Sequence, residues 1–250
     1  MIGSRKWMEI NQGSLSFKEK INLLKQTLLP TTYKYAKTFI QSHVNHTHFA
    51  LHDVQIPDTP MVKEAMTELE NTQDQVIFHH SWRSFFWGVG IAHSKDWHFD
   101  QESFVIACLM HDLGLVEHLD QYSCNCFTYE SALRSENLCL KHQYDASRTK
   151  IISEAICLHM NGYLDESNQD LPIEALLLQQ ATSCDVIGTD YARFSKTYAE
   201  DVLIQHPRTQ FNSHFKKLLH KESLNHPQSR TALVSRLGLP YMIQLNIFKE

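Results

Sequence analysis

The sequence contains little glycine and proline, and it has no long apolar segment. Only 8 Gly and 7 Pro occur among 250 residues, so few turns interrupt the chain and long elements are expected. The longest apolar stretch, residues 85–92, is far too short to cross a bilayer, and the N-terminus lacks the apolar core of a secretory signal. A soluble, cytoplasmic protein with no membrane partner is therefore expected.

Concentrated positive charge is also missing. The formal net charge is -5, and the largest basic cluster is the pair Lys216-Lys217, which is interpreted as a solvated helix face. A protein that binds a nucleic-acid backbone needs a basic surface, so no nucleic-acid partner is expected. The sequence also has no Gly-rich phosphate loop, Gly-x-Ser-x-Gly elbow or dinucleotide fingerprint, which argues against the enzyme classes that depend on them.

The 6 cysteines form no disulfide framework. One residue separates Cys124 from Cys126, whereas zinc knuckles and redox motifs need two. The remaining cysteines lie in helical, mostly apolar segments: Cys108, Cys139, Cys157 and Cys184. They are expected to be reduced, structural thiols, and no local signature supports a Cys-His nucleophile.

Length and periodicity predict one compact all-α domain. With 42% apolar residues, a chain of this length can bury a sizeable core. Helix starts are marked by Thr59 before Pro60 and by Asp100, which is followed by Glu102 in the first turn. Segments with helical periodicity are 17–29, 31–41, 61–69, 76–92, 100–112, 129–142, 146–160, 172–188 and 208–224. Residues 241–248 alternate between apolar and polar and are expected to be extended.

Ligand-type side chains occur in segments that otherwise resemble buried helix. His111-Asp112 ends a run, residues 102–110, that is apolar on nearly every side, so both side chains are expected to be desolvated. An unpaired carboxylate there costs several kcal/mol, so Asp112 should have a cation or strong donors. The following Leu113-Gly114 is a helix stop, and two adjacent side chains can turn toward one point at a helix end.

Two further helices repeat this pattern. Asp185 continues the apolar stripe of Leu178, Ala181 and Thr182, so its carboxylate is expected to point inward. His80 lies within 76–92, with Arg83 and Trp87 on its face. A core histidine satisfied by a carbonyl and a carboxylate in a cap or ion pair are the simpler interpretations. As a set, however, the imidazoles and carboxylates match the N and O ligands of Zn, Fe, Mn, Co or Ni, although spacing alone does not show that they converge.

The ordered combination of these segments resembles a known superfamily. The relevant stretches are HSWRSFFWG at 80–88, MHDLGL at 110–115 and DVIG at 185–188, together with IPDTP at 56–60 and AICLH at 155–159. They resemble the His…His-Asp…Asp pattern of the HD metal-dependent hydrolase superfamily, and within it the cyanamide hydratase-like branch. The resemblance covers residues 55–190 and is far more specific than a His-Asp dipeptide.

The resemblance implies an HD-domain helical bundle over residues 55–205, with a helical N-terminal extension, 1–54, packed on it and a helical C-terminal tail, 206–250. The implied metal ligands are His80, His111, Asp112 and Asp185. They would hold one divalent ion, zinc first and Fe, Mn, Co or Ni as alternatives, and leave a position where bound water becomes a nucleophile. The implied reaction adds that water to a small nitrile. Whether the tail packs on a second copy of the chain, giving a homo-oligomer, is left open.

Roles follow for neighbouring residues. His159 continues an inward stripe and is the candidate proton donor to nitrogen, with a core histidine as the alternative; in dinuclear HD proteins this stretch adds a metal-binding His. Asp112 is expected to relay the proton of the water. Arg83 is expected to brace Asp112 or another carboxylate at the catalytic centre. Trp87 and Thr182 are candidate substrate-binding residues on the pocket wall.

Departures from the pattern bear on the substrate. HD nucleotidases have a Glu three residues after the metal-binding Asp, but this sequence has Leu115, which counts against a phosphomonoesterase. The branch's Phe-Glu pair is replaced by Phe127-Thr128, and Glu130 is the nearest candidate for the substrate-side role. A phosphohydrolase acting on a nucleotide or other phosphate ester remains the alternative, and a catalytically inactive small-molecule-binding domain is a second one.

Two other histidine patterns are interpreted as unrelated to the site. His52-Asp53 precedes a loop instead of ending an apolar helix, and no partners follow at the required intervals. A histidine cluster at His43, His46, His48 and His52 fits neither one helix face nor one strand face, so adventitious metal binding is the expectation there.

Overall fold

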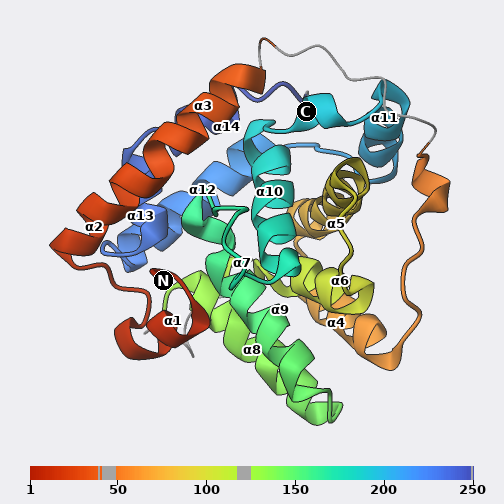
Figure 1. The fold of residues 1–250 in the computed structure, drawn as a ribbon, viewed down its shortest axis with the longest axis horizontal. Helices are drawn as coiled ribbons and strands as arrows, with labels where there is room; N and C mark the ends of the chain where they lie inside the picture. The colour runs from red at the N-terminus through yellow and green to blue at the C-terminus, as the bar shows by residue number, and fades with distance from the viewer. Residues whose placement is uncertain (39, 41–48, 117–124, 249) are drawn as a thin grey trace.

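The computed structural model describes residues 1–38, 40, 49–116, 125–248 and 250 (Figure 1). Within these ranges every regular element is a helix, which confirms the predicted all-α class. No helix among them is long and apolar enough to span a membrane.

The α-helices are, in chain order, α1 (Arg5–Asn11), α2 (Phe17–Leu23), α3 (Leu29–Thr38), α4 (Pro60–Asn71), α5 (Gln75–Lys95), α6 (Gln101–Met110), α7 (Leu113–Val116), α8 (Phe127–Lys141), α9 (Ala146–Leu158), α10 (Ile173–Ile187), α11 (Lys196–Gln205), α12 (Phe211–Asn225), α13 (Arg230–Arg236) and α14 (Leu239–Gln244). A π-helical turn, η1 (Leu24–Leu28), joins α2 to α3, and short 3-10 helices are η2 (Leu51–Asp53), η3 (His159–Asn161) and η4 (Tyr191–Arg193).

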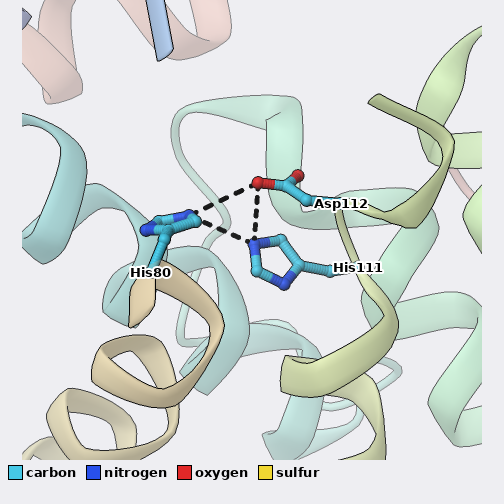
Figure 2. A group of neighbouring side chains, drawn as sticks. All are labelled: His80, His111 and Asp112. Atoms are coloured by element: carbon cyan, nitrogen blue, oxygen red, sulfur yellow. Dashed lines mark hydrogen bonds and ion pairs between the residues drawn. The ribbon is translucent and has the colours of Figure 1, made fainter. Parts of the chain in front are cut away.

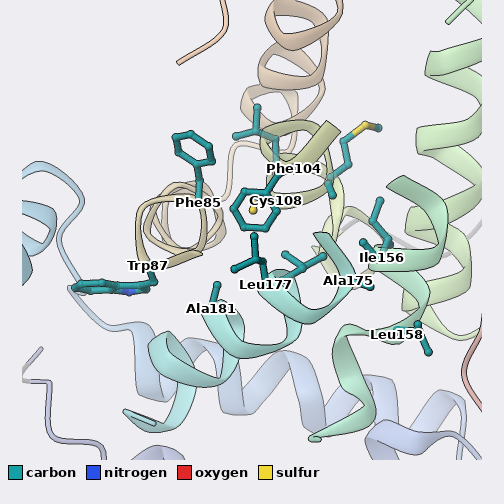
Figure 3. Packing of buried hydrophobic residues seen from close by; sticks show 14 of the residues in the cluster. Phe85, Trp87, Phe104, Cys108, Ile156, Leu158, Ala175, Leu177 and Ala181 are labelled. Atoms are coloured by element: carbon teal, nitrogen blue, oxygen red, sulfur yellow. The ribbon is translucent and has the colours of Figure 1, made fainter. Parts of the chain in front are cut away.

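Four helices form the centre of the molecule: α5, α6, α9 and α10. Helix α5 packs along α10, while α6 contacts both α5 and α9 (Figure 1). The core between them contains Phe104 and Cys108 of α6 beside Leu177 and Ala181 of α10 (Figure 3). All four of these side chains are fully buried, so the apolar periphery of each helix faces another helix and not solvent.

Local sequence determines where helix α5 begins and how closely it packs. Asp74 caps its N-terminus by accepting hydrogen bonds from the backbone N–H groups of Val76 and Ile77. Every residue from 80 to 92 is buried, so no face of this part of the helix meets solvent. Gly88 is required there because a Cβ atom would lie 2.2 Å from Cζ of Phe104. The absence of a side chain therefore sets the close approach of α5 and α6.

The N-terminal segment departs from the predicted pair of helices separated at Pro30. Helices α2 and α3 are joined through η1 into one continuous rod (Figure 1). Pro30 lacks an N–H group and would clash with the preceding turn of a regular α-helix. The wider π-helical turn immediately before it accommodates the proline without ending the helix.

The prediction of an extended segment over 241–248 is wrong for residues 241–244, which belong to α14. Gly238 begins this helix with φ +105°, and Pro240 occupies its first turn, where a missing N–H group costs nothing. Ile243 is fully buried, and Leu239 and Met242 also pack against the core, so apolar contacts hold the short helix in place. The alternation in sequence therefore belongs to a short helix with buried and exposed sides and not to a strand.

Candidate metal centre

Three ligand-type side chains from two helices converge at the centre of the molecule: His80, His111 and Asp112 (Figure 2). Nε2 of His80 lies 3.3 Å from Nε2 of His111 and 3.4 Å from Oδ2 of Asp112, and Nε2 of His111 lies 3.3 Å from the same oxygen. None of these residues is more than 2% exposed. The structure therefore brings together three of the four ligands that the resemblance implies.

Local structure explains this convergence. Helix α6 ends at Met110, His111 is its C-cap, and Asp112 follows before α7 begins. Because the chain leaves helical geometry here, adjacent side chains that would otherwise diverge by about 100° can face one point. The backbone N–H of Gly114 donates to Oγ of Ser131 on α8 and fixes this turn.

The tautomers of the histidines are set by acceptors behind each ring. His80 donates from Nδ1 to Oδ2 of Asp185, and His111 donates from Nδ1 to the carbonyl oxygen of Cys108, both over 2.7 Å. His159 does the same to the carbonyl oxygen of Ile156, again over 2.7 Å. Carbonyl and carboxylate oxygens only accept, so Nδ1 of each ring carries a proton, and Nε2 is the nitrogen that presents a lone pair whenever the ring is neutral.

The result is a buried group rich in lone pairs. Oδ2 of Asp112 has no hydrogen-bond partner among the described residues, although it is buried between two imidazole nitrogens. Burial acts to raise the pKa of Asp112, but His111, His80 and His159 outweigh it and hold that pKa well below its usual range. A buried anion beside these nitrogens needs a positive charge, either a proton on an imidazole Nε2 or a bound cation. The donor set of imidazole nitrogen and carboxylate oxygen fits a divalent transition ion.

His159 lies beside this group, with Nε2 3.7 Å from Oδ1 of Asp112. Burial lowers the pKa of His159 to about 3, and the charge of His111 acts in the same direction. A neutral His159 with its proton on Nδ1 has none on Nε2 to deliver. This geometry speaks against the predicted proton-donor role and makes His159 a further ligand-type nitrogen.

Asp185 lies on the opposite side of the His80 ring, away from the group that converges. Oδ1 of Asp185 accepts from Nε of Arg83 and Nε1 of Trp87, and it lies 3.2 Å from Nη1 of Arg208. Oδ2 accepts from Nη2 of Arg83 and Nδ1 of His80. Both oxygens are thus occupied by donors, so this placement gives no support to Asp185 as the fourth ligand. Its role here is to orient His80.

A cavity of about 110 Å³ opens onto the candidate metal centre, with His80, His111, Asp112 and His159 in its wall. Thr182, a predicted substrate-binding residue, also lines it. The apolar part of the wall consists of Met160, Val186, Ile187, Phe215, Val234, Leu237, Leu239 and Met242. No Lys or Arg belongs to the lining among the described residues. The cavity is therefore a small, mostly apolar space with one polar end.

Three other predicted site residues lie outside this cavity lining. Trp87 is fully buried and hydrogen-bonds to Asp185, so it is not a pocket wall. Arg83 braces a carboxylate, as predicted, and its two hydrogen bonds show that this carboxylate is Asp185. Glu130 lines a separate surface groove with Arg134. The positions of Trp87 and Glu130 correct their predicted substrate-side roles, because packing between helices decides which cavity a side chain reaches.

Residues from both extensions complete the site, and sequence reasoning missed them. Phe211 and Phe215 of α12 lie against the His80 ring, with ring centroids 5.0 and 5.4 Å away. Thr27 of η1 and Thr31 of α3 line the cavity from the N-terminal side. The two phenylalanines are four residues apart, a spacing typical of one helix face, but this spacing carries no information about which surface that face covers.

The remaining predictions concern a second His-Asp pair, a histidine cluster and the cysteines. His52 and Asp53 are exposed in η2, consistent with their interpretation as an unrelated pair. His43, His46 and His48 lie outside the described residues, as does Cys124. The described cysteines are buried and carry no disulfide: Cys108, Cys126, Cys139, Cys157 and Cys184. Comparison with protein-family models and with curated proteins found no match to this chain.

Proposed function

We propose that the protein is a one-metal enzyme of the HD type that adds water to a small neutral substrate. His80, His111 and Asp112 would hold the ion, with His159 beside them. The observation that carries the proposal is that Nε2 of His80 and Nε2 of His111 lie beside Oδ2 of Asp112, which has no hydrogen-bond partner among the described residues, while the Nδ1 proton of each ring is held from behind. Such a group is unfavourable without a cation.

Zinc is the first candidate for the ion, and Fe, Mn, Co or Ni are the alternatives, because the donor set does not distinguish among them. When bound, the ion would supply an electrophile that lowers the pKa of water toward neutrality. The protein's own contribution is orientation. Arg83 and Asp185 hold His80 through its Nδ1 proton, and the carbonyl oxygen of Cys108 does the same for His111.

Asp112 is the group placed to move a proton. Its Oδ2 faces His80 and His111, whereas Oδ1 lies on the His159 side. Oδ1 is the atom that would take up a proton from water and return it to the substrate nitrogen. The apolar wall excludes bulk water, which strengthens each of these interactions and prevents loss of the proton.

The cavity favours a small neutral nitrile over a phosphate ester. A space of about 110 Å³ suits a molecule of a few heavy atoms, since an apolar cavity of about 150 Å³ admits benzene. Phosphate recognition relies on cations, yet the cavity lining contains none within the described part of the chain, and Arg83 and Arg208 are both bound to Asp185. Hydration of a nitrile, as in the cyanamide hydratase-like branch, is therefore the reaction proposed.

The deciding experiment is metal content by elemental analysis, combined with hydration assays on cyanamide and short alkyl nitriles. Wild type is expected to contain about one transition ion per chain, and Asp112→Ala is expected to lose it together with activity. Asp53→Ala is the matched control, because it removes the carboxylate of an exposed His-Asp pair.

Three other outcomes are informative. If wild type binds metal but hydrates no nitrile, phosphate esters are the next substrates to assay. If it binds a nitrile without metal or turnover, it is a small-molecule-binding domain. A wild type that cannot be loaded with any transition ion contradicts the proposal.

A further inference from the structure

A second, much smaller pocket adjoins the apolar cavity, and we call it the annex. Thr31, Gly162 and Ser183 line both spaces, so the annex borders the cavity directly. Its volume is about 10 Å³, close to the space that one water molecule requires. In contrast to the cavity, the annex is lined mainly by polar side chains.

Four side-chain atoms of annex residues have no hydrogen-bond partner within the described part of the chain. They are Oε1 of Gln179, Nε2 of Gln180, Oγ1 of Thr189 and Oδ2 of Asp190. The first three side chains belong to residues that are at most 3% exposed. Lys34 approaches Oδ2 of Asp190, but its Nζ remains 3.9 Å away, beyond hydrogen-bonding distance. Native proteins leave few such atoms unpaired, so four around one small pocket indicate a missing partner.

In Gln179 and Gln180, one end of the side-chain amide is already hydrogen-bonded, and this fixes the orientation of the amide. Gln179 donates from Nε2 to the carbonyl oxygen of Gly162 and to Oγ of Ser183, which leaves its Oε1 as the free acceptor. Gln180 accepts from Nζ of Lys95 at Oε1, which leaves its Nε2 as the free donor. Asp190 uses Oδ1 for Nε of Arg193. The annex therefore offers acceptors, a donor and a hydroxyl to whatever occupies it.

We propose that the annex is a hydrogen-bonding subsite of the cavity that holds one neutral hydroxyl group. That hydroxyl belongs to a water molecule or to the distal end of the substrate. A hydroxyl both donates and accepts, as the unpaired atoms require, and the annex is too small for more than about one heavy atom. The substrate arm of this inference rests on the proposed nitrile hydration, because the reacting carbon would lie at the other end of the cavity.

The first test is independent of catalysis and uses Thr189→Val. If a water molecule bonds to the Thr189 hydroxyl, the variant loses that bond and its Tm should fall by about 2–4 °C. Thr189→Ser keeps the hydroxyl and should retain most of the wild-type Tm. Ser135→Ala is the control, because it removes a buried hydroxyl whose partner, the carbonyl oxygen of Ala132, is known. An unchanged or raised Tm in Thr189→Val means a dry annex in the free protein and excludes water as the source of the hydroxyl, and together with equal binding in the second test it overturns the proposal.

The second test separates the two sources of the hydroxyl. Pentanenitrile and 4-hydroxybutanenitrile have the same length and differ only in a terminal methyl or hydroxyl. Binding to metal-loaded wild type, measured by NMR titration, should favour the hydroxyl compound about tenfold or more if the substrate reaches the annex. Gln179→Leu should remove that preference.

Equal binding, together with an ordered water in the annex of a crystal structure, assigns the hydroxyl to water. Equal binding and no ordered water overturn the proposal. The proposed function fails separately, if neither compound is hydrated by protein that contains the metal.

Discussion

Two fully buried carboxylates lie on either side of one imidazole ring, and they have opposite surroundings. Asp185 is enclosed by N–H donors from Arg83, Arg208 and Trp87, besides the Nδ1 proton of His80. Asp112, on the Nε2 side, faces ring nitrogens of His80 and His111, and its Oδ2 has no hydrogen-bond partner among the described residues. Burial is the same for both, so burial alone does not distinguish a structural carboxylate from a ligand. The neighbouring atoms do distinguish them, because N–H donors surround Asp185 whereas ring nitrogens face Asp112.

The two aspartates are therefore expected to support different properties of the protein: Asp185 the stability of the fold, and Asp112 the binding of a metal ion. The charge of Asp185 is compensated by the protein, and Arg83 and Arg208 depend on it in turn. The charge of Asp112 is compensated only partly, by histidines that would also bind a metal. Substitution at Asp185 is therefore expected to affect the fold first, and substitution at Asp112 the metal first.

Asp185→Asn should have the largest effect. It keeps the shape of the side chain but leaves two buried guanidinium groups without their anion, and breaking a buried ion pair in this way costs about 3–5 kcal/mol. Urea unfolding should show this loss in the metal-free protein. Glu174→Gln is the control, since Glu174 is buried but accepts only a backbone N–H in the described structure, from Asp100. Metal should still bind to Asp185→Asn, about 10–100-fold more weakly. If this variant binds no metal at all, Asp185 is also essential for metal binding, and the proposed difference between Asp185 and Asp112 is contradicted.

Metal addition should have the next largest effect. With free ion at about 100 times its Kd, the free energy of unfolding should rise by about 2.7 kcal/mol. Asp112→Asn should abolish most of this increase, while its metal-free stability changes far less than that of Asp185→Asn. Thermal unfolding with and without a chelator measures both quantities. A full metal-dependent increase in Asp112→Asn would show that Asp112 is not a ligand.

The smallest effect is expected at Asp100, whose carboxylate is half-buried. Burial acts to raise its pKa, but hydrogen bonds from Arg148 and Ser103 outweigh this and lower the pKa below 3.8. Its stabilising contribution is therefore present above pH 3.8 and is lost as the pH falls through the lower, folded-state pKa. Asp100→Asn should cost less than about 1 kcal/mol at pH 7, because the pair is partly exposed. The Tm difference from wild type should close below pH 3.8, and a difference that persists at lower pH would contradict this account.

Much of the fold was readable from local signals. The predicted caps at Thr59 and Asp100 begin α4 and α6, as their side chains require. The apolar run before His111 predicted that this residue and Asp112 would be buried at a helix end, and they are. These features depend on neighbours within one or two turns, so a single sequence contains them.

The assignment of partners was not readable in the same way. Periodicity placed Asp185 and His159 on inward faces, but an inward face has more than one neighbour. Which side of His80 each residue meets is decided by the packing of α5 against α10 and by Arg208, which is distant in sequence. The same limit applies to Phe211 and Phe215, whose apolar stripe was visible while the surface it covers was not.

The attachment of Arg208 and Asn246 to Asp185 has a consequence for how the protein is made. Asn246 donates to the backbone carbonyl oxygens of Asp185 and Val186, and Arg208 approaches the carboxylate itself. A ribosome produces His80, Asp112 and Asp185 well before either of these residues. The complete set of donors around Asp185 therefore exists only after residues 208–246 have left the ribosome, so a metal ion held by the proposed site would bind after synthesis.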